Sequence, residues 1–139
     1  MKVKRALPGL FFLLVSTVGY AEVAVIVNPK NSNILDERDI RKIYLGKSKT
    51  YPDGSKAEPL EFSAGSTTRD EFLVKVLKKD EATLNSHWAR MLFSSKAQPP
   101  KPVTSVAEMK SQVAANPAAI GYIDAAQVDG SVKVLLRIN

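Results

Sequence analysis

Short apolar runs alternate with amphipathic segments along most of this chain, and this alternation limits its possible folds more than any other feature. The run from Val23 to Asn28 is apolar and β-branched and is followed by Pro29, as expected of a buried strand. Further strand-like runs occupy 58–62, 120–123 and 132–138. Strands that alternate with helices predict a single three-layer α/β domain with a mostly parallel sheet.

Residues typical of helix starts precede the amphipathic segments. Asp36 fits the N-cap of the first helix, and Gly46 fits the left-handed position that follows its end. A later helix is expected from Asp80, and Ser105 with Glu108 forms a capping box ahead of the last one. The residues between the strand-like runs are therefore expected to be helical.

The first 21 residues differ from the rest. Lys2, Lys4 and Arg5 precede an apolar run from Leu10 to Val18, and small residues lead up to Ala21. This is the order of a secretory signal peptide cleaved after Ala21, and the apolar run is shorter than the ~20 residues that span a bilayer. We therefore expect 1–21 to be removed and 22–139 to form the mature domain.

Composition excludes several classes of function. The chain has no Cys and one His, so it offers no disulfide, no thiolate zinc site, no cysteine nucleophile and no multi-histidine metal site. Without the first 21 residues, 17 basic residues face 14 acidic ones, a net charge of +3 that argues against nucleic acid as a partner. No cofactor and no metal are expected. An exported, cysteine-free domain of this size points to the bacterial periplasm.

One constellation offers chemistry, at the junction of the strand 58–62 and the following helix. The candidate oxyanion-binding residues are Gly65, Ser66, Thr67, Thr68 and Arg69. Free backbone N–H groups and the helix dipole favour an anion at such a junction, and an arginine can hold oxyanion oxygens in bidentate fashion. In open α/β sheets, ligands bind outside the carboxyl ends of strands, which is where this loop falls.

The same loop also fits a simpler interpretation as a helix cap. Thr68 with Glu71 forms a capping box, and Thr67 with Asp70 forms a rival one for the same helix start. In that case the acidic residues satisfy the helix dipole and no ligand is needed. The residues alone leave both interpretations open.

Several segments resemble, in order, the substrate-binding proteins of phosphate ABC transporters. They are VAVIVNPKN, DIRKIYLGK, AGSTTRDEF, the tryptophan helix HWARMLF and AAIGYID. The resemblance implies a periplasmic-binding-protein-like lobe that holds phosphate or a similar oxyanion through backbone amides and hydroxyls. By motif position, Ser66, Thr68 and Arg69 match family residues. Thr67 stands where the family has Gly, and Phe62 and Ala64 stand where phosphate binders often have an arginine and an acidic residue.

The leading hypothesis is a non-enzymatic periplasmic protein that recognises phosphate or a related oxyanion and is linked to ABC-type phosphate uptake or sensing. An ABC transporter permease or an envelope sensor protein is then its partner, and a homodimer could complete the pocket. The alternative is an envelope interaction module that keeps the lobe without binding a small ligand. It predicts no oxyanion affinity and an exposed apolar patch. His87 lacks a nucleophile or carboxylate partner at a recognisable spacing and is expected to have a packing or surface role.

Overall fold

The structure is a computed structural model that describes Gly9 and residues 22–139, so the predicted signal peptide lies, apart from Gly9, outside the described residues. The helices and strands, in chain order, are β1 (Val23–Val27), α1 (Glu37–Tyr44), β2 (Glu58–Phe62), α2 (Thr67–Phe72), the π-helix η1 (Leu73–Leu77), α3 (Glu81–Phe93), β3 (Lys101–Val103), α4 (Val106–Ala115), β4 (Ala119–Asp124), the 3₁₀ turn η2 (Ala125–Gln127) and β5 (Lys133–Ile138). Among the described residues, no helix is long and apolar enough to cross a membrane.

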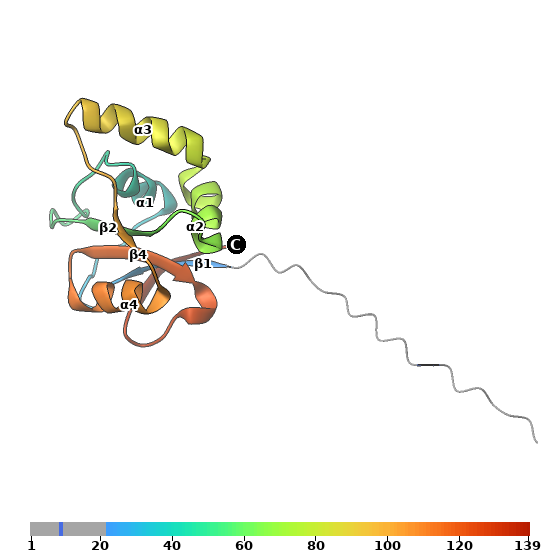
Figure 1. Cartoon of the computed structure of the whole chain (residues 1–139). Helices are drawn as coiled ribbons and strands as arrows, with labels where there is room; N and C mark the ends of the chain where they lie inside the picture. Colours follow the sequence, from blue (N-terminus) through green and yellow to red (C-terminus); the bar gives the residue numbers. More distant parts are fainter. Residues whose placement is uncertain (1–8, 10–21) are drawn as a thin grey trace, which may run out of the picture.

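The five strands form one open sheet in the order β3-β2-β4-β1-β5 (Figure 1). β2 pairs in parallel with both β3 and β4, whereas β1 is antiparallel to β4 and β5. Four strands therefore point the same way, and the predicted α/β fold class with a mostly parallel sheet is confirmed. The direction of β1 was not predicted. β1 lies between β4 and β5 and runs against both, with Val23 opposite both Asp124 and Ile138.

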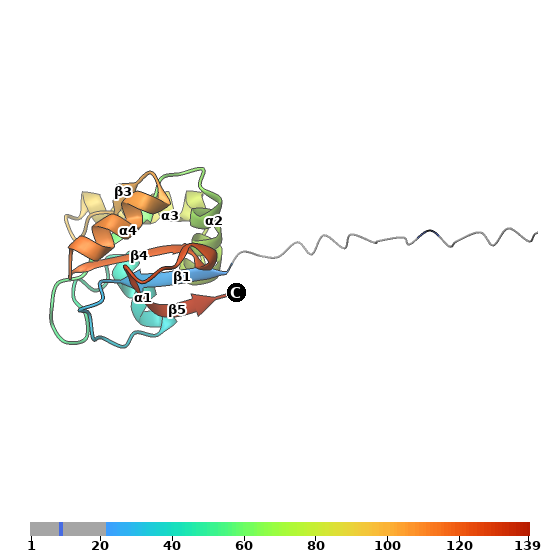
Figure 2. The same ribbon diagram turned by 90° about the horizontal axis from the view of Figure 1, so that it is seen from below.

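Helices cover both faces of the sheet, as Figures 1 and 2 show. Neighbouring residues of β4 point to opposite faces. A Cβ placed on Gly121 would approach Met109 of α4, whereas the ring of Tyr122 lies against Phe72 of α2 on the other face. The expected three layers are therefore present, with α4 on one side and α1 and α2 on the other.

The sheet centre and an aromatic cluster form the core. All five residues of β1 are fully buried, which explains their uninterrupted apolar character. Tyr122 stacks on Phe72 with ring centroids 3.9 Å apart, and Tyr44 meets Phe72 edge-on at 4.7 Å. The Tyr44 hydroxyl donates to the backbone oxygens of β2 and β4, so its burial costs no hydrogen bond.

The predicted starts of α1, α3 and α4 are confirmed. The Asp36, Asp80 and Ser105 side chains accept from the backbone N–H three residues on. Gly46, with φ +72°, follows the end of α1 as expected. His87 has the predicted packing role, since it is buried and its Nε2 lies 2.8 Å from the Leu45 carbonyl oxygen.

The strand β3, the π-helix η1 and the short turn η2 were not predicted. β3 falls in a proline-rich stretch, which an edge strand tolerates because one side of it needs no ladder hydrogen bonds. α2 continues as the π-helix η1, which ends at Lys78 in the left-handed conformation. The Arg41 side chain of α1 donates to the Val76 carbonyl oxygen at 2.8 Å and so satisfies one carbonyl of η1.

Candidate functional site

The candidate site lies where β2 and β3 end. Phe62 and Val103, the last residues of these parallel strands, lie opposite each other, and each is followed by a short loop and a helix. The Ser63 N–H donates to the Val103 carbonyl oxygen at 3.2 Å and ties the two loops together. The result is a hollow of about 360 Å³, called here the carboxyl-end hollow, lined by Phe62, Ser63, Ala64, Ser66, Thr68, Val103, Thr104, Ser105 and Val106.

The first turn of α2 forms one wall of this hollow, and its cap differs from the prediction. Ser66 is the N-cap, and its Oγ accepts from the Arg69 N–H at 3.3 Å. The expected caps, Thr67 and Thr68, lie inside the helix. The physical reason is the turn at Gly65, whose φ of +93° reverses the chain early enough for helical geometry to begin at Thr67.

Several backbone donors in this wall are free. In the part of the chain that the structure describes, the N–H groups of Gly65, Thr67 and Thr68 have no hydrogen-bond acceptor. Such donors are normal for a first helical turn and carry partial positive charge. They favour an anion at this end of α2.

The other wall comes from the loop between β3 and α4, which the sequence analysis did not connect to the site. Ser105 caps α4 by accepting from the Glu108 N–H at 3.0 Å. The Glu108 carboxylate in turn accepts from the Thr104 N–H at 2.8 Å and from its hydroxyl at 3.0 Å. The Ser105 cap was visible in the sequence, whereas Glu108 accepts from Thr104 and not from the Ser105 N–H that a capping box requires. The place of this cap beside the 63–68 loop was not visible, because it depends on the unpredicted strand β3.

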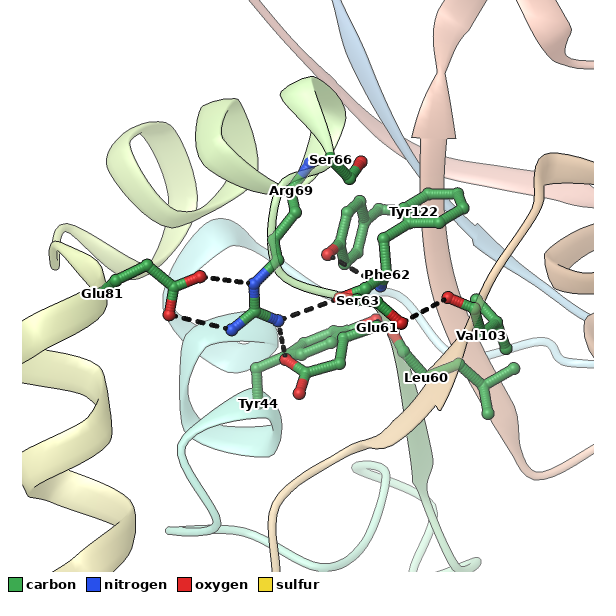
Figure 3. Close-up of polar contacts among 10 residues, drawn as sticks. All are labelled: Tyr44, Leu60, Glu61, Phe62, Ser63, Ser66, Arg69, Glu81, Val103 and Tyr122. Carbon is green, nitrogen blue, oxygen red and sulfur yellow. Dashed lines mark hydrogen bonds and ion pairs between the residues drawn. The ribbon is translucent and has the colours of Figure 1, made fainter.

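Arg69 does not line the hollow. Its guanidinium lies between Glu61 and Glu81, as Figure 3 shows. Its Nη1 lies 2.7 Å from Glu61 Oε2 and donates to the Phe62 carbonyl oxygen at 3.0 Å. Its Nε and Nη2 donate to the two carboxylate oxygens of Glu81 at 2.7 and 3.2 Å. The expected arginine clamp on an oxyanion therefore does not match this geometry, because two carboxylates already hold the guanidinium.

The electrostatics of this cluster follow from burial and pairing. Hydrogen bonding to Glu81 is the main reason why the pKa of Arg69 is raised, and the same bond lowers the pKa of Glu81. For Glu61, burial outweighs the attraction of Arg69, so the pKa of this carboxyl is raised above its ordinary value. Arg69 is a fixed cation at every physiological pH.

Of the five predicted residues, two line the carboxyl-end hollow. Ser66 and Thr68 do so directly, whereas Gly65 and Thr67 belong to the same turn without lining it. Arg69 lies on the far side of the loop and holds it through the Phe62 carbonyl oxygen.

Tyr122, Glu61 and Glu81, which support this loop, were missed by the sequence analysis. The Tyr122 hydroxyl accepts from the Phe62 N–H at 3.2 Å, so this side chain of β4 holds the end of β2 in place. No spacing signal connects residues so far apart in the chain.

The acidic residues at the start of α1 have a capping role. The acidic residues Asp36 and Asp39 form the capping box of α1. Among the described residues, no group of three or more His, Cys, Asp or Glu side chains could hold a metal ion.

No protein-family model and no curated protein matches this chain. Several solved structures are similar to this chain. An ABC-type phosphate transport receptor from Vibrio cholerae aligns over 83% of this chain and 46% of its own, with a TM-score of 0.64 and 23% identity. A protein described as a phosphate ABC transporter substrate-binding protein from Clostridium perfringens, solved with bound phosphate, aligns over 83% and 45%, with a TM-score of 0.65 and 25% identity.

PstS from Borrelia burgdorferi aligns over the same share of this chain with a TM-score of 0.60 and 17% identity. The chain has the fold of one periplasmic-binding-protein-like lobe. The predicted resemblance to phosphate ABC transporter substrate-binding proteins is thus confirmed for the fold. This lobe spans less than half the length of the proteins that it matches.

Proposed function

We propose that this lobe is a non-enzymatic periplasmic protein that binds phosphate or a related oxyanion in the carboxyl-end hollow. The observation that carries the proposal is the meeting of two helix N-termini, of α2 and α4, at one hollow. The fold likeness to proteins described as phosphate receptors supports the same ligand class. Its partner would be an ABC transporter permease or an envelope sensor protein.

The contacts of the bound anion follow from the donors at the hollow. The backbone N–H group of Thr68 would donate to its oxygens, together with the hydroxyls of Ser66 and Thr68. Ser66 Oγ accepts from the Arg69 N–H, so its own proton is available to a ligand. In this proposal Arg69 is a positioning residue, which holds the loop without touching the anion.

Calorimetric titration of the anion-stripped protein with phosphate, and then with sulfate, at low salt tests the proposal. Thr68→Val removes a hydroxyl while keeping the shape of the side chain, and we expect it to weaken binding at least tenfold. Thr83→Val is the matched control, because Thr83 is an exposed threonine in the first turn of α3, away from the hollow. Absence of saturable heat from folded protein, or an equal effect of both variants, would contradict the site.

A second candidate function, an envelope interaction module, is favoured by a separate observation. Phe93 at the end of α3 is 95% exposed, and the neighbouring Leu92 is half exposed. An exposed apolar pair of this kind is typical of a protein contact surface. Neither Leu92 nor Phe93 lines the carboxyl-end hollow, so the two functions are compatible with each other.

A further inference from the structure

The C-terminal end of α3 carries an unusual apolar surface. Of the described residues with large apolar side chains, only Ile34, Val74, Leu92 and Phe93 are exposed. Scattered apolar residues are ordinary on protein surfaces, but Leu92 and Phe93 are adjacent and lie beside a hollow. Leu92 and Phe93 therefore form a candidate contact surface, whereas Ile34 and Val74 are ordinary single exposed residues.

The hollow is formed by two segments that are distant in sequence. It has a volume of about 400 Å³, is called here the lysine hollow, and is lined by Lys49, Leu92, Ser95, Lys96, Ala97 and Gln98. The loop that follows α1 packs closely on the segment that follows α3, because a Cβ added to Gly46 would lie 2.7 Å from the Cβ of Ala97. The contact of His87 Nε2 with the Leu45 carbonyl oxygen joins α3 itself to the end of α1.

The charge around this surface is positive. Lys49 and Lys96 line the hollow, Lys47 is exposed on the same loop as Lys49, and Arg90 is exposed one turn before Phe93. None of these four cations has a carboxylate partner within residues 22–139. The surface thus combines an apolar projection, a concave floor and unpaired positive charge.

We propose that the lysine hollow and Phe93 bind an acidic, apolar segment of a partner protein. Such a segment would place an apolar side chain in the hollow against Leu92 and Ala97, and its carboxylates would face Lys49 and Lys96. Phe93 would be covered by the same segment. The surface is small, so the complex is of the weak, reversible class.

The charge pattern selects this occupant over a second copy of the chain. A two-fold dimer places the same surface on both sides of the interface, so Lys49 and Lys96 would face their own copies and repel. The concave shape of the hollow also favours a protein segment over a lipid bilayer, because a protein segment can insert a side chain into the hollow and a bilayer surface cannot. Charge complementarity therefore points to an acidic protein segment.

This surface is separate from the carboxyl-end hollow. Lys49 lies in the loop before β2, and the paired residues Thr50 and Lys56 lead into the start of this strand. The carboxyl-end hollow follows the end of β2 at Phe62. The inference goes beyond the proposed oxyanion site and does not depend on it.

Selection of a phage-displayed random peptide library on the purified protein tests the proposal. Enriched peptides are then synthesised, and their dissociation constants are measured for the wild type and two double variants, Leu92→Ser with Phe93→Ser and Lys49→Glu with Lys96→Glu. Val74→Ser and Arg137→Glu are the controls, because they alter an exposed apolar and an exposed cationic residue on η1 and β5. Thermal melts verify that every variant is folded.

The expected result is enrichment of peptides that combine Asp or Glu with a large apolar residue. Each double variant should weaken their binding at least tenfold, and the controls should change it less than twofold. The proposal is overturned if no such peptides are enriched or if the double variants bind them like the wild type. It is also overturned if sedimentation shows a dimer that Phe93→Ser dissociates, or if the protein binds anionic vesicles through Phe93.

Discussion

Arg69 and Glu81 form a two-point ion pair, with Nε 2.7 Å from Oε1 and Nη2 3.2 Å from Oε2. Arg69 belongs to α2 and Glu81 opens α3, so the pair joins the first turns of two helices across the π-helix η1. The same guanidinium also contacts Glu61 of β2 and the Phe62 carbonyl oxygen. A single side chain thus connects the candidate oxyanion loop to the sheet and to α3.

Replacement of Arg69 should destabilise the fold strongly. Arg69→Met keeps much of the buried stem but leaves Glu61 as a largely buried carboxylate without its cation, and such a loss costs about 3–5 kcal/mol. Glu81→Gln is the control, because Glu81 is more exposed and its loss leaves Arg69 paired with Glu61; we expect a cost of about 1 kcal/mol. Urea unfolding at pH 7 measures both. Equal effects of the two substitutions would contradict this account.

Glu61 gives the cluster a distinctive dependence on pH. The pKa of its carboxyl is raised above the ordinary value of 4.5, mainly because the group is buried. The folded state therefore takes up this proton at a higher pH than the unfolded chain, and the ionised carboxylate lowers the free energy of unfolding at neutral pH. Glu61→Gln copies the neutral form, so this variant should be more stable than the wild type at pH 7.

The advantage of Glu61→Gln should shrink as the pH falls from 7 towards 4.5, because the wild-type side chain then becomes neutral as well. Unfolding of both proteins across this range measures the difference. Glu81→Gln should behave in the opposite way, since the pKa of Glu81 is lowered and its stabilising effect is present at neutral pH and lost in acid. A Glu61→Gln difference that is constant with pH would disprove the role of this carboxyl.

Gly46 should tolerate no side chain. Its φ is +72°, and an added Cβ would lie 2.7 Å from the Cβ of Ala97 and 3.2 Å from the Trp88 ring. Gly46→Ala therefore combines backbone strain with overpacking and should cost about 2–4 kcal/mol. Gly54→Ala is the matched control, because Gly54 also has a positive φ but has open space around it; about 1 kcal/mol is expected. Similar melting temperatures for both variants would exclude the close contact.

Local signals in the sequence were sufficient to predict the fold class and most of the helix starts. Asp36 and Ser105 are the N-caps that the sequence predicted, and α3 follows Asp80 as expected, because a cap is formed within a few residues. The cap of α2 was misplaced because the turn at Gly65, where φ is positive, decides where that helix begins. A sequence pattern shows which residues can cap, and it does not show which backbone conformation the preceding glycine adopts.

The candidate site was predicted only in part for a related reason. The motif placed Ser66 and Thr68 at the end of β2, and both line the hollow. Arg69 could hold an oxyanion, as expected, only if its guanidinium were not already paired with carboxylates. Glu61 alternates along β2 onto the side of Arg69, and Glu81 reaches it only through the left-handed turn at Lys78 after η1. These relationships are tertiary and leave no signature in spacing.

Glu108 should limit the affinity of the carboxyl-end hollow for anions. Its carboxylate lies against Thr104, a lining residue, and the pKa of this carboxyl is lowered by these hydrogen bonds, so the group is ionised at neutral pH. Glu108→Gln removes the charge while its side-chain oxygen can still accept from Thr104.

We expect Glu108→Gln to strengthen phosphate binding about three- to tenfold at low salt, and the gain should fall as salt screens the charge. Asp129→Asn is the control, since Asp129 is an exposed acid paired with Lys110. Calorimetric titration at two ionic strengths separates the outcomes. A gain that persists undiminished at high salt would contradict an electrostatic role of Glu108, and an equal gain from Asp129→Asn would assign the effect to the net charge of the protein.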